Sequence, residues 1–164
     1  MRTVELFKKK TVLSYEVFPP KPTSPVNTIY ETLDELKELS HDFISVTYGA
    51  GGGKNNSETF KIASAVKGYG IESVIHLPCT RLTKEDVSQK LNELKSIGIE
   101  NILALRGDIP SEGCVQGDFK YASDLVAYIK KQGDFNVIAA CYPEGHIESK
   151  TKVEDIQNLK IKVD

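Results

Sequence analysis

The sequence predicts an α/β fold of the TIM (β/α)8 barrel type, with about five βα units in the chain. Three observations predict it: strand-like and helix-like runs alternate strictly, no dinucleotide-binding glycine loop follows the first strand, and every strand ends in polar residues. Strict alternation indicates a parallel sheet with right-handed crossovers. The chain has 164 residues, whereas a barrel takes about 250. We therefore expect residues 1–164 to form one incomplete barrel domain that lacks roughly three units.

Five strand-like runs are short and rich in β-branched and apolar residues. They are Val12–Phe18, Phe43–Tyr48, Ser73–Leu77, Asn101–Leu105 and Asn136–Cys141. Pro19-Pro20 ends the first run, and this proline pair cannot form the Gly-rich turn of a Rossmann sheet. An open doubly wound sheet and a barrel both fit the alternation itself.

A helix-like run follows each strand, and most of these runs open with a capping signal. The expected starting points are Ser24-Pro25, Ser57, Thr83, Ala122 and Thr151. Ser24-Pro25 combines an N-cap residue with proline at the first helical position. Thr83 and Asp86 have the spacing of a capping box, and so do Thr151 and Glu154. The helix that opens at Ala122 is expected to end at Lys131.

The two faces of the strands favour a barrel over an open sheet. One face is small or polar and becomes more polar toward the carboxyl ends; it holds Ser14, Glu16, Ser45, Thr47, Val74, His76, Ala104, Arg106, Ala140 and Tyr142. The other face is apolar and suits contact with helices; it holds Leu13, Val17, Ile44, Val46, Ile75, Leu103 and Leu105. Barrel enzymes keep their sites at the carboxyl ends of the strands.

Glu16 is the most informative single residue. We expect it to be buried, and a carboxylate on an otherwise apolar strand is costly to bury unless it is paired or used. Pairing with Arg106 would explain it structurally, and a role in a site would explain it functionally. Gly49–Gly53 follow the second strand but match neither the dinucleotide fingerprint nor the P-loop. They form either a plain loop or a loop whose backbone approaches a ligand closely.

Composition excludes several classes of function. The net charge of −2 comes from nearly balanced basic and acidic residues, so there is no electrostatic footprint for nucleic acid. No run reaches the length of a membrane span, and the first residues do not resemble a signal peptide. We expect reduced cysteines and a cytoplasmic protein. The three cysteines are far apart and form no CxxC pair, which argues against a metal site and a disulfide framework.

The strand ends carry motifs that together resemble the methylenetetrahydrofolate reductase family, of the bacterial FAD-dependent type. The motifs are Ser14-Tyr15-Glu16-Val17-Phe18-Pro19-Pro20-Lys21, Ser45-Val46-Thr47-Tyr48-Gly49-Ala50, Leu103-Ala104-Leu105-Arg106-Gly107-Asp108-Ile109-Pro110, Tyr121-Ala122-Ser123-Asp124-Leu125-Val126 and Ala140-Cys141-Tyr142-Pro143-Glu144-Gly145-His146. The resemblance covers essentially the whole chain and corresponds to the N-terminal five-eighths of the family's TIM barrel.

The resemblance implies a flavin-dependent oxidoreductase of one-carbon and methionine metabolism. FAD would pass hydride from NADH or NADPH to 5,10-methylenetetrahydrofolate and give 5-methyltetrahydrofolate. Glu16 is implied as the general acid that opens the bridging methylene, and Asp108 as a second catalytic residue beside flavin and pterin. The implied cofactor residues are Thr47, Tyr48, Ala50, His76, Arg106, Gly107, Tyr121, Ala122, Ala140, Tyr142, His146 and Asp164.

Two readings stay open on the sequence. The chain is either a fragment of this enzyme or a noncatalytic half-barrel that binds flavin or serves in assembly. A homo-oligomer and an electron-donating partner protein are both compatible with the resemblance. Five units would leave the first and last strands with unpaired edges, which are prone to association.

Overall fold

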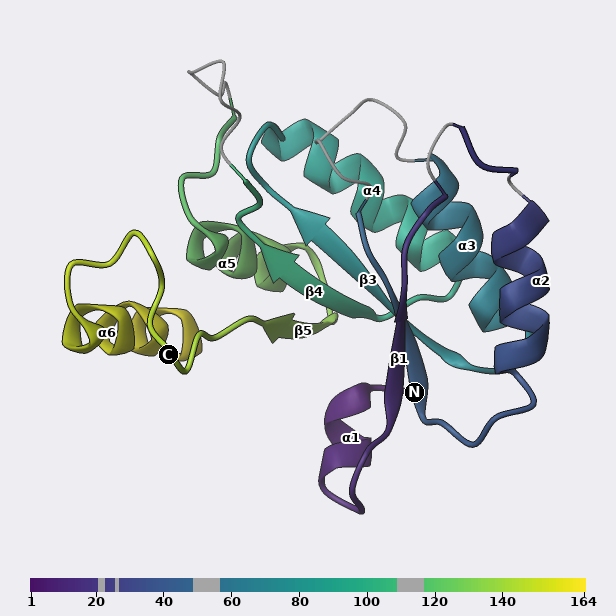
Figure 1. Cartoon of the computed structure of the whole chain (residues 1–164). Coiled ribbons are helices and arrows are strands. Elements are labelled where there is room, and N and C mark those ends of the chain that lie inside the picture. The colour runs from purple at the N-terminus through teal and green to yellow at the C-terminus, as the bar shows by residue number, and fades with distance from the viewer. Residues whose placement is uncertain (21–22, 26, 49–56, 109–116) are drawn as a thin grey trace.

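The computed structural model describes residues 1–20, 23–25, 27–48, 57–108 and 117–164, which contain a five-stranded parallel sheet. The strands are β1 (Ser14–Val17), β2 (Phe43–Val46), β3 (Glu72–Pro78), β4 (Asn101–Leu105) and β5 (Asn136–Ala139). Each strand pairs with the next one along the chain, in the order β1-β2-β3-β4-β5 (Figure 1). The predicted α/β fold with parallel strands is therefore confirmed.

A helix follows each strand, and the helices that lie between two strands cover one face of the sheet. They are α2 (Asn27–Leu36), α3 (Ser57–Gly68), α4 (Lys84–Ser96), α5 (Ala122–Gln132) and α6 (Lys152–Val163). α3 packs on β2 and β3, while α5 packs on β4 and β5. The main core lies in this interface, where side chains such as Ile44, Ile75 and Ile102 are fully buried.

The register shows which side chains share a face of the sheet. His76 of β3 lies opposite Leu103 of β4, so Leu103 lies on the same face as His76. Ala104 is buried in the core beneath the helices instead. The predicted faces of β4 were therefore wrong. A strand that is buried on both sides is apolar along its whole length. The polar–apolar alternation therefore could not show which side chains of β4 lie on which face.

A short helix that the sequence analysis missed, α1 (Thr3–Phe7), lies at the amino ends of the strands (Figure 1). Leu6 packs there against Phe43 and Val74, on the face of the sheet that carries Glu16. Five residues are too few to give a periodic pattern, and an isolated helix of this length is unstable in water. Tertiary contacts therefore determine α1.

A buried polar cluster ties α1 to the sheet. Asn101 Oδ1 accepts hydrogen bonds from the Thr3 backbone N–H at 2.9 Å and from Asn136 Nδ2 at 2.8 Å. Asn136 Nδ2 also donates to Thr3 Oγ1 at 2.8 Å, and Asn101 Nδ2 donates to the Met1 carbonyl at 3.1 Å. Because Thr3, Asn101 and Asn136 are buried, each loss of a partner in this cluster would leave a desolvated polar group.

The predicted capping signals have mixed outcomes. The capping box at Thr83 is present, with Asp86 bonding in both directions. Thr151 accepts from the Glu154 N–H, but Glu154 bonds the N–H of Lys150 rather than that of Thr151. α2 begins at Asn27, later than the expected Ser24-Pro25 start, which is within the usual uncertainty of helix boundaries.

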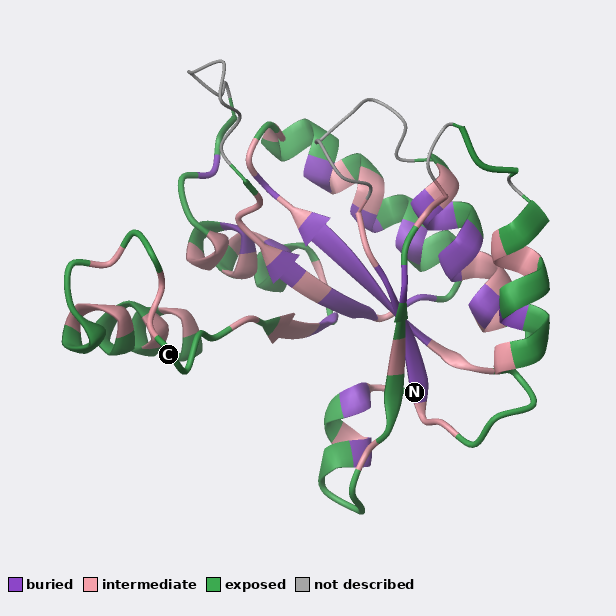
Figure 2. Cartoon of the chain, in the orientation of Figure 1, coloured by how far each residue is buried: buried purple, intermediate pink, exposed green. Residues whose placement is uncertain are grey.

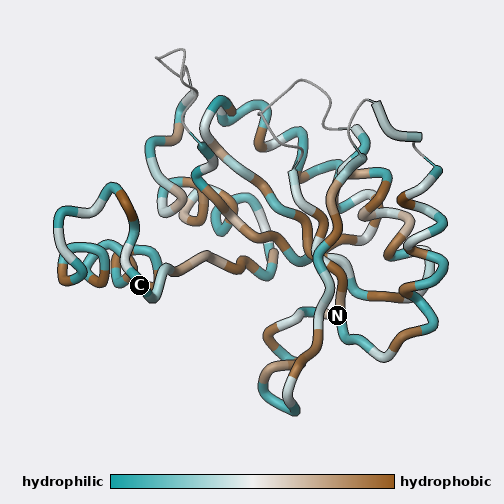
Figure 3. The backbone as a smooth tube through the Cα atoms, in the orientation of Figure 1, coloured by the Kyte–Doolittle hydropathy of each residue, from teal (hydrophilic) through white to brown (hydrophobic). Residues whose placement is uncertain are grey.

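The last helix, α6, has no buried residue. Figure 2 shows it in exposed and intermediate colours only, and Figure 3 shows hydrophobic positions along it. Val153, Ile156 and Val163 are between 65% and 75% exposed. α6 therefore presents apolar side chains to the outside and adds little to the core.

We predict that Asn101→Ala destabilises the protein by about 2–3 kcal/mol, because it leaves the Thr3 N–H and the Asn136 amide without their acceptor. Urea unfolding followed by circular dichroism measures the change. Asn158→Ala, at an exposed position of α6, is the matched control and should stay within about 0.5 kcal/mol of wild type. Equal stability of the two variants would contradict the role of the cluster.

Candidate functional site

Glu16, Ser45 and His76 come together on the first three strands. Glu16 Oε2 lies 3.4 Å from Ser45 Oγ and 3.4 Å from His76 Nε2. The contact with His76 is electrostatic, because its geometry is not that of a hydrogen bond. The Glu16 side chain is 58% exposed whereas that of His76 is 10% exposed. The expected buried carboxylate is thus accessible, and its neighbours are Ser45 and His76 rather than Arg106.

Burial changes the acid–base behaviour of His76. Desolvation lowers the pKa of this imidazole from its ordinary value of 6.5, and the nearby Glu16 carboxylate opposes the change only in part. The imidazole is therefore held in its neutral form beside a carboxylate that faces solvent. A neutral ring can accept or donate a proton at Nε2, the atom nearest to Glu16.

The segment after β2 is held by backbone contacts. The Thr47 N–H donates to the Val17 carbonyl at 2.9 Å, and the Thr47 carbonyl accepts from Thr59 Oγ1 at 3.2 Å. Tyr48 is partly buried, with Lys90 Nζ 5.8 Å from its ring centroid, and burial raises the pKa of its phenol. Ala50, the third predicted residue here, lies outside the described residues.

Backbone hydrogen bonds connect the segments that follow β3 and β4, at Arg106 and Gly107. The Arg106 carbonyl accepts from the N–H groups of Cys79 and Thr80, at 3.1 and 2.9 Å. Gly107 has a φ of +85°, and a Cβ atom there would lie 2.9 Å from Pro78 Cβ and 3.1 Å from Thr80 Oγ1. Glycine is required at this position for both reasons.

The side chain of Arg106 pairs with Glu148, a residue that the sequence analysis did not single out. Arg106 Nη1 and Nη2 donate to the two carboxylate oxygens at 2.6 Å each. The pair raises the pKa of Arg106 and lowers that of Glu148. Glu148 lies in the loop between β5 and α6, where the Tyr142 and His146 rings meet edge to face, with centroids 4.9 Å apart.

The remaining predicted residues lie at several places around the same edge. Tyr121, half exposed, precedes Ala122 at the start of α5, and its N–H donates to Asp124. Ala140 accepts a hydrogen bond from Lys162 Nζ at 2.7 Å. Asp108 is exposed directly after Gly107.

Two aspartates of the last helix have different surroundings. Asp164 pairs with Lys160 at the end of α6. Asp155, at the opposite end of the helix, accepts from the His146 N–H at 3.1 Å. Asp164 follows Asp155 by nine positions, which corresponds to about 14 Å along the helix axis. Asp155 is therefore the aspartate that contacts the predicted site. It lies outside the sequence motifs, so the sequence contained no signal for it.

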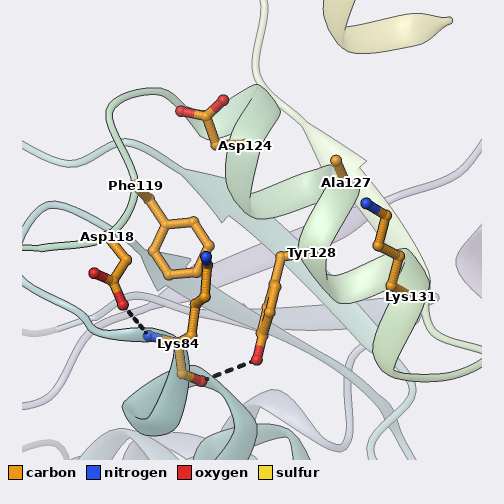
Figure 4. Close-up of a pocket in the computed structure, with 7 residues that line it drawn as sticks. All are labelled: Lys84, Asp118, Phe119, Asp124, Ala127, Tyr128 and Lys131. Carbon is orange, nitrogen blue, oxygen red and sulfur yellow. Dashed lines mark hydrogen bonds between the residues drawn. The ribbon is translucent and has the colours of Figure 1, made fainter.

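A shallow pocket lies elsewhere, between α4 and α5 (Figure 4). It is lined by Lys84, Asp118, Phe119, Asp124, Ala127, Tyr128 and Lys131. Tyr128 spans it, donating to the Lys84 carbonyl at 3.3 Å, and Asp118 accepts from the Lys84 N–H at 2.9 Å. None of the predicted site residues lines this pocket.

Three further observations concern metal binding, thiol reactivity and membrane crossing in the part of the chain that the structure describes. No cluster of His, Cys, Asp or Glu there could hold a metal ion. Burial raises the pKa of the Cys79 thiol to about 11, which disfavours the reactive thiolate. No helix in those ranges is long and apolar enough to cross a membrane.

Comparisons with known proteins agree with the motifs. A family model described as methylenetetrahydrofolate reductase matches residues 2–164. The 5,10-methylenetetrahydrofolate reductases of Escherichia coli K12 and Pectobacterium carotovorum are 39% and 38% identical to the chain, of which each match covers 93%. A probable methylenetetrahydrofolate reductase (NADH) of rice is 37% identical over 94% of the chain. The chain spans about half of the two bacterial relatives and 29% of the rice protein.

We predict that Gly107→Ala costs about 2 kcal/mol or more, because it combines an unfavourable φ with a close contact to Pro78. Gly70→Ala separates the two effects, since Gly70 has a φ of +79° and open space around it. Gly68→Ala lies in helix α3, where an added Cβ atom would meet no neighbouring side chain within 4 Å, so it should be neutral or slightly stabilising. Urea unfolding ranks the three variants, and equal costs for Gly107→Ala and Gly70→Ala would exclude the contact as a contribution.

We predict that His76 makes stability depend on pH on the acidic side of neutrality. Since its pKa is lowered in the folded protein, the unfolded chain binds the proton more readily. The contribution of His76 to the free energy of unfolding is therefore complete above about pH 6.5 and decreases as the pH falls below that value. Unfolding midpoints at pH 7.5, 6.5 and 5.5 should fall less steeply for His76→Gln than for wild type. Identical slopes would show that His76 is not the group responsible.

Proposed function

Because the chain belongs to the methylenetetrahydrofolate reductase family, we propose that it supplies the catalytic acid and most of the flavin contacts of a methylenetetrahydrofolate reductase. The proposed reaction is the reduction of 5,10-methylenetetrahydrofolate to 5-methyltetrahydrofolate with FAD as cofactor and NADH or NADPH as donor. The rice relative named as NADH-dependent favours NADH. The observation that carries the proposal is the accessible Glu16 carboxylate on β1. Its Oε2 atom lies 3.4 Å from both Ser45 Oγ and His76 Nε2.

The order of the strands supports a barrel as the complete architecture. Every strand of the described sheet adds to the edge left by the previous one. Doubly wound sheets reverse their strand order at a switch point, and this sheet contains no such reversal. We propose that the five strands form part of a (β/α)8 barrel, whose ligands lie at the carboxyl ends of the strands.

The side chains at this edge fit a flavin dinucleotide. Arg106 offers a cation for the phosphates, Gly107 allows the backbone to approach closely, and Tyr121 and Tyr142 are half exposed with apolar rings. The residues proposed to hold FAD are Thr47, Tyr48, His76, Arg106, Gly107, Tyr121, Ala122, Ala140, Tyr142 and His146, with Ala50 outside the described residues. Asp164 is retained from the motif resemblance alone, because its carboxylate pairs with Lys160.

Glu16 would act first, at Oε2, donating a proton to the folate so that its bridging methylene opens to a reactive cation. Bound reduced flavin would supply the hydride that this cation accepts. Ser45 and His76 orient Oε2 of Glu16 from two sides. Asp108 is exposed beside Gly107, where it would accept hydrogen bonds from the amino edge of the pterin. Thr47 would contact the folate and the nicotinamide in turn.

A second candidate function is that of a flavin-binding or assembly module without catalysis. The apolar side chains that α6 exposes, and the position of β1 and β5 at the two edges of the described sheet, favour this alternative. Such surfaces promote association. The two candidates differ in whether the bound flavin reduces the folate at all.

We predict that Glu16→Gln spares reduction of the flavin by NADH but slows reduction of the folate by about 10²–10⁴-fold, the usual contribution of a general acid. Purified protein is loaded with FAD, and the two half-reactions are followed anaerobically through the flavin absorbance. Glu38→Gln, an exposed carboxylate on the surface, serves as the control and should match wild type in both.

Three results would oppose the proposed function. Equal losses in both half-reactions would make Glu16 a structural residue. A wild-type protein that binds FAD but does not reduce the folate would favour the noncatalytic module. A wild-type protein that takes up no FAD, shown by the absence of a flavin spectrum after gel filtration, would contradict the proposed cofactor.

A further inference from the structure

One carboxylate outside the predicted set, Glu148, connects three residues that are proposed to hold FAD. Its two oxygens bind Arg106 Nη1 and Nη2 at 2.6 Å. Its backbone N–H donates to His146 Nδ1 at 3.2 Å, and the His146 ring rests edge to face on Tyr142. Glu148 therefore joins the end of β4 to the loop that follows β5.

We propose that Glu148 is a positioning residue that aims Arg106 and His146 at an anionic group of the cofactor, a phosphate of the dinucleotide. The inference rests on the proposed function, because it takes FAD as the ligand of this edge of the sheet. Glu148 acts through its neighbours and does not itself contact the ligand.

The hydrogen-bond donors of Arg106 support this role. A guanidinium has five N–H groups. Two of them bind Glu148, and Nε donates to the Gly107 carbonyl at 3.3 Å. Two remain, one on each terminal nitrogen, on the edges that Glu148 does not occupy. A bidentate carboxylate fixes the plane of the guanidinium, so these two donors have a defined direction.

The same residue determines which nitrogen of His146 can donate. Because Nδ1 accepts the Glu148 N–H, the neutral ring carries its hydrogen on Nε2. That nitrogen is therefore a donor, as recognition of a phosphate requires. Glu148 thus prepares donors on two different elements for one anionic group.

The loop around Glu148 is held in place by its own contacts. Asp155 Oδ2 accepts from the His146 N–H and Asp155 Oδ1 accepts from Ser149 Oγ, both at 3.1 Å. The Gly145 N–H donates to the Tyr142 carbonyl at 2.9 Å. A loop ordered before binding reduces the entropy lost when a ligand binds.

Exposure makes orientation a better explanation of the pair than stability. The Glu148 side chain is 51% exposed, and exposed ion pairs add little to the free energy of folding. A variant of Glu148 should therefore fold normally, so that its effect on binding can be measured separately.

The test compares Glu148→Gln with Glu144→Gln, which removes an exposed carboxylate from the same loop. FAD and riboflavin, which lacks phosphate, are titrated into the flavin-free protein and followed by flavin fluorescence. We expect Glu148→Gln to weaken FAD binding about tenfold or more, as for a lost charge-assisted hydrogen bond. Riboflavin affinity should change less than about twofold, and Glu144→Gln should match wild type with both ligands.

Each alternative gives a different result. Tighter binding of FAD to Glu148→Gln would show that the carboxylate competes with the phosphate for Arg106. Equal weakening of FAD and riboflavin would show a general structural effect. Either result, or unchanged binding of both, overturns the inference.

Nuclear magnetic resonance of Arg106 tests the inference without any flavin and so separates it from the proposed function. In the wild-type protein the Nε–H signal of Arg106 should be narrow and slow to exchange, because the guanidinium is held in place. In Glu148→Gln it should broaden or exchange faster. Equal signals in both proteins would overturn the inference, whereas a wild-type protein that binds no FAD would contradict the proposed function alone.

Discussion

The parallel pairing of each strand with the next is the constraint on which the rest of the structure depends. It directs all five carboxyl ends to one edge of the sheet, so residues far apart in the sequence become neighbours there. Glu16, Ser45 and His76 meet because β1, β2 and β3 are adjacent and in register. The contacts between Arg106 and the loop after β5 follow in the same way from the adjacency of β4 and β5.

The two ends of the sheet serve different purposes. At the amino ends, the polar cluster of Thr3, Asn101 and Asn136 is buried and joined by hydrogen bonds beneath α1, which suits a structural role. At the carboxyl ends, Glu16 and Tyr142 are more than half exposed, which suits contact with a ligand. In barrels of alternating strands and helices, residues at the amino ends of the strands generally serve stability and residues at the carboxyl ends serve function.

The sequence predicted the strands and most helix starts, because these depend on local patterns. It also places the site at the carboxyl ends of the strands, and that stays a prediction. It could not predict α1 or the faces of β4, since both depend on contacts that no local pattern records. The expected burial of Glu16 was wrong because β1 lies at the edge of the described sheet and leaves that carboxylate open. Glu148 was missed because its importance comes from Arg106, 42 residues away.

The segment after β5 shows how weak anchoring and binding are connected. No side chain of α6 is buried, so this segment is held by a few polar bonds, among them those of Lys162 to Ala140 and of Asp155 to His146, and by contacts with α5. The same segment carries Tyr142 and His146, which are proposed to hold FAD. A ligand that binds the ordered segment and not its open form stabilises it by mass action. Occupancy by the dinucleotide and ordering of the last βα unit should therefore increase together, with the pair between Arg106 and Glu148 as the link.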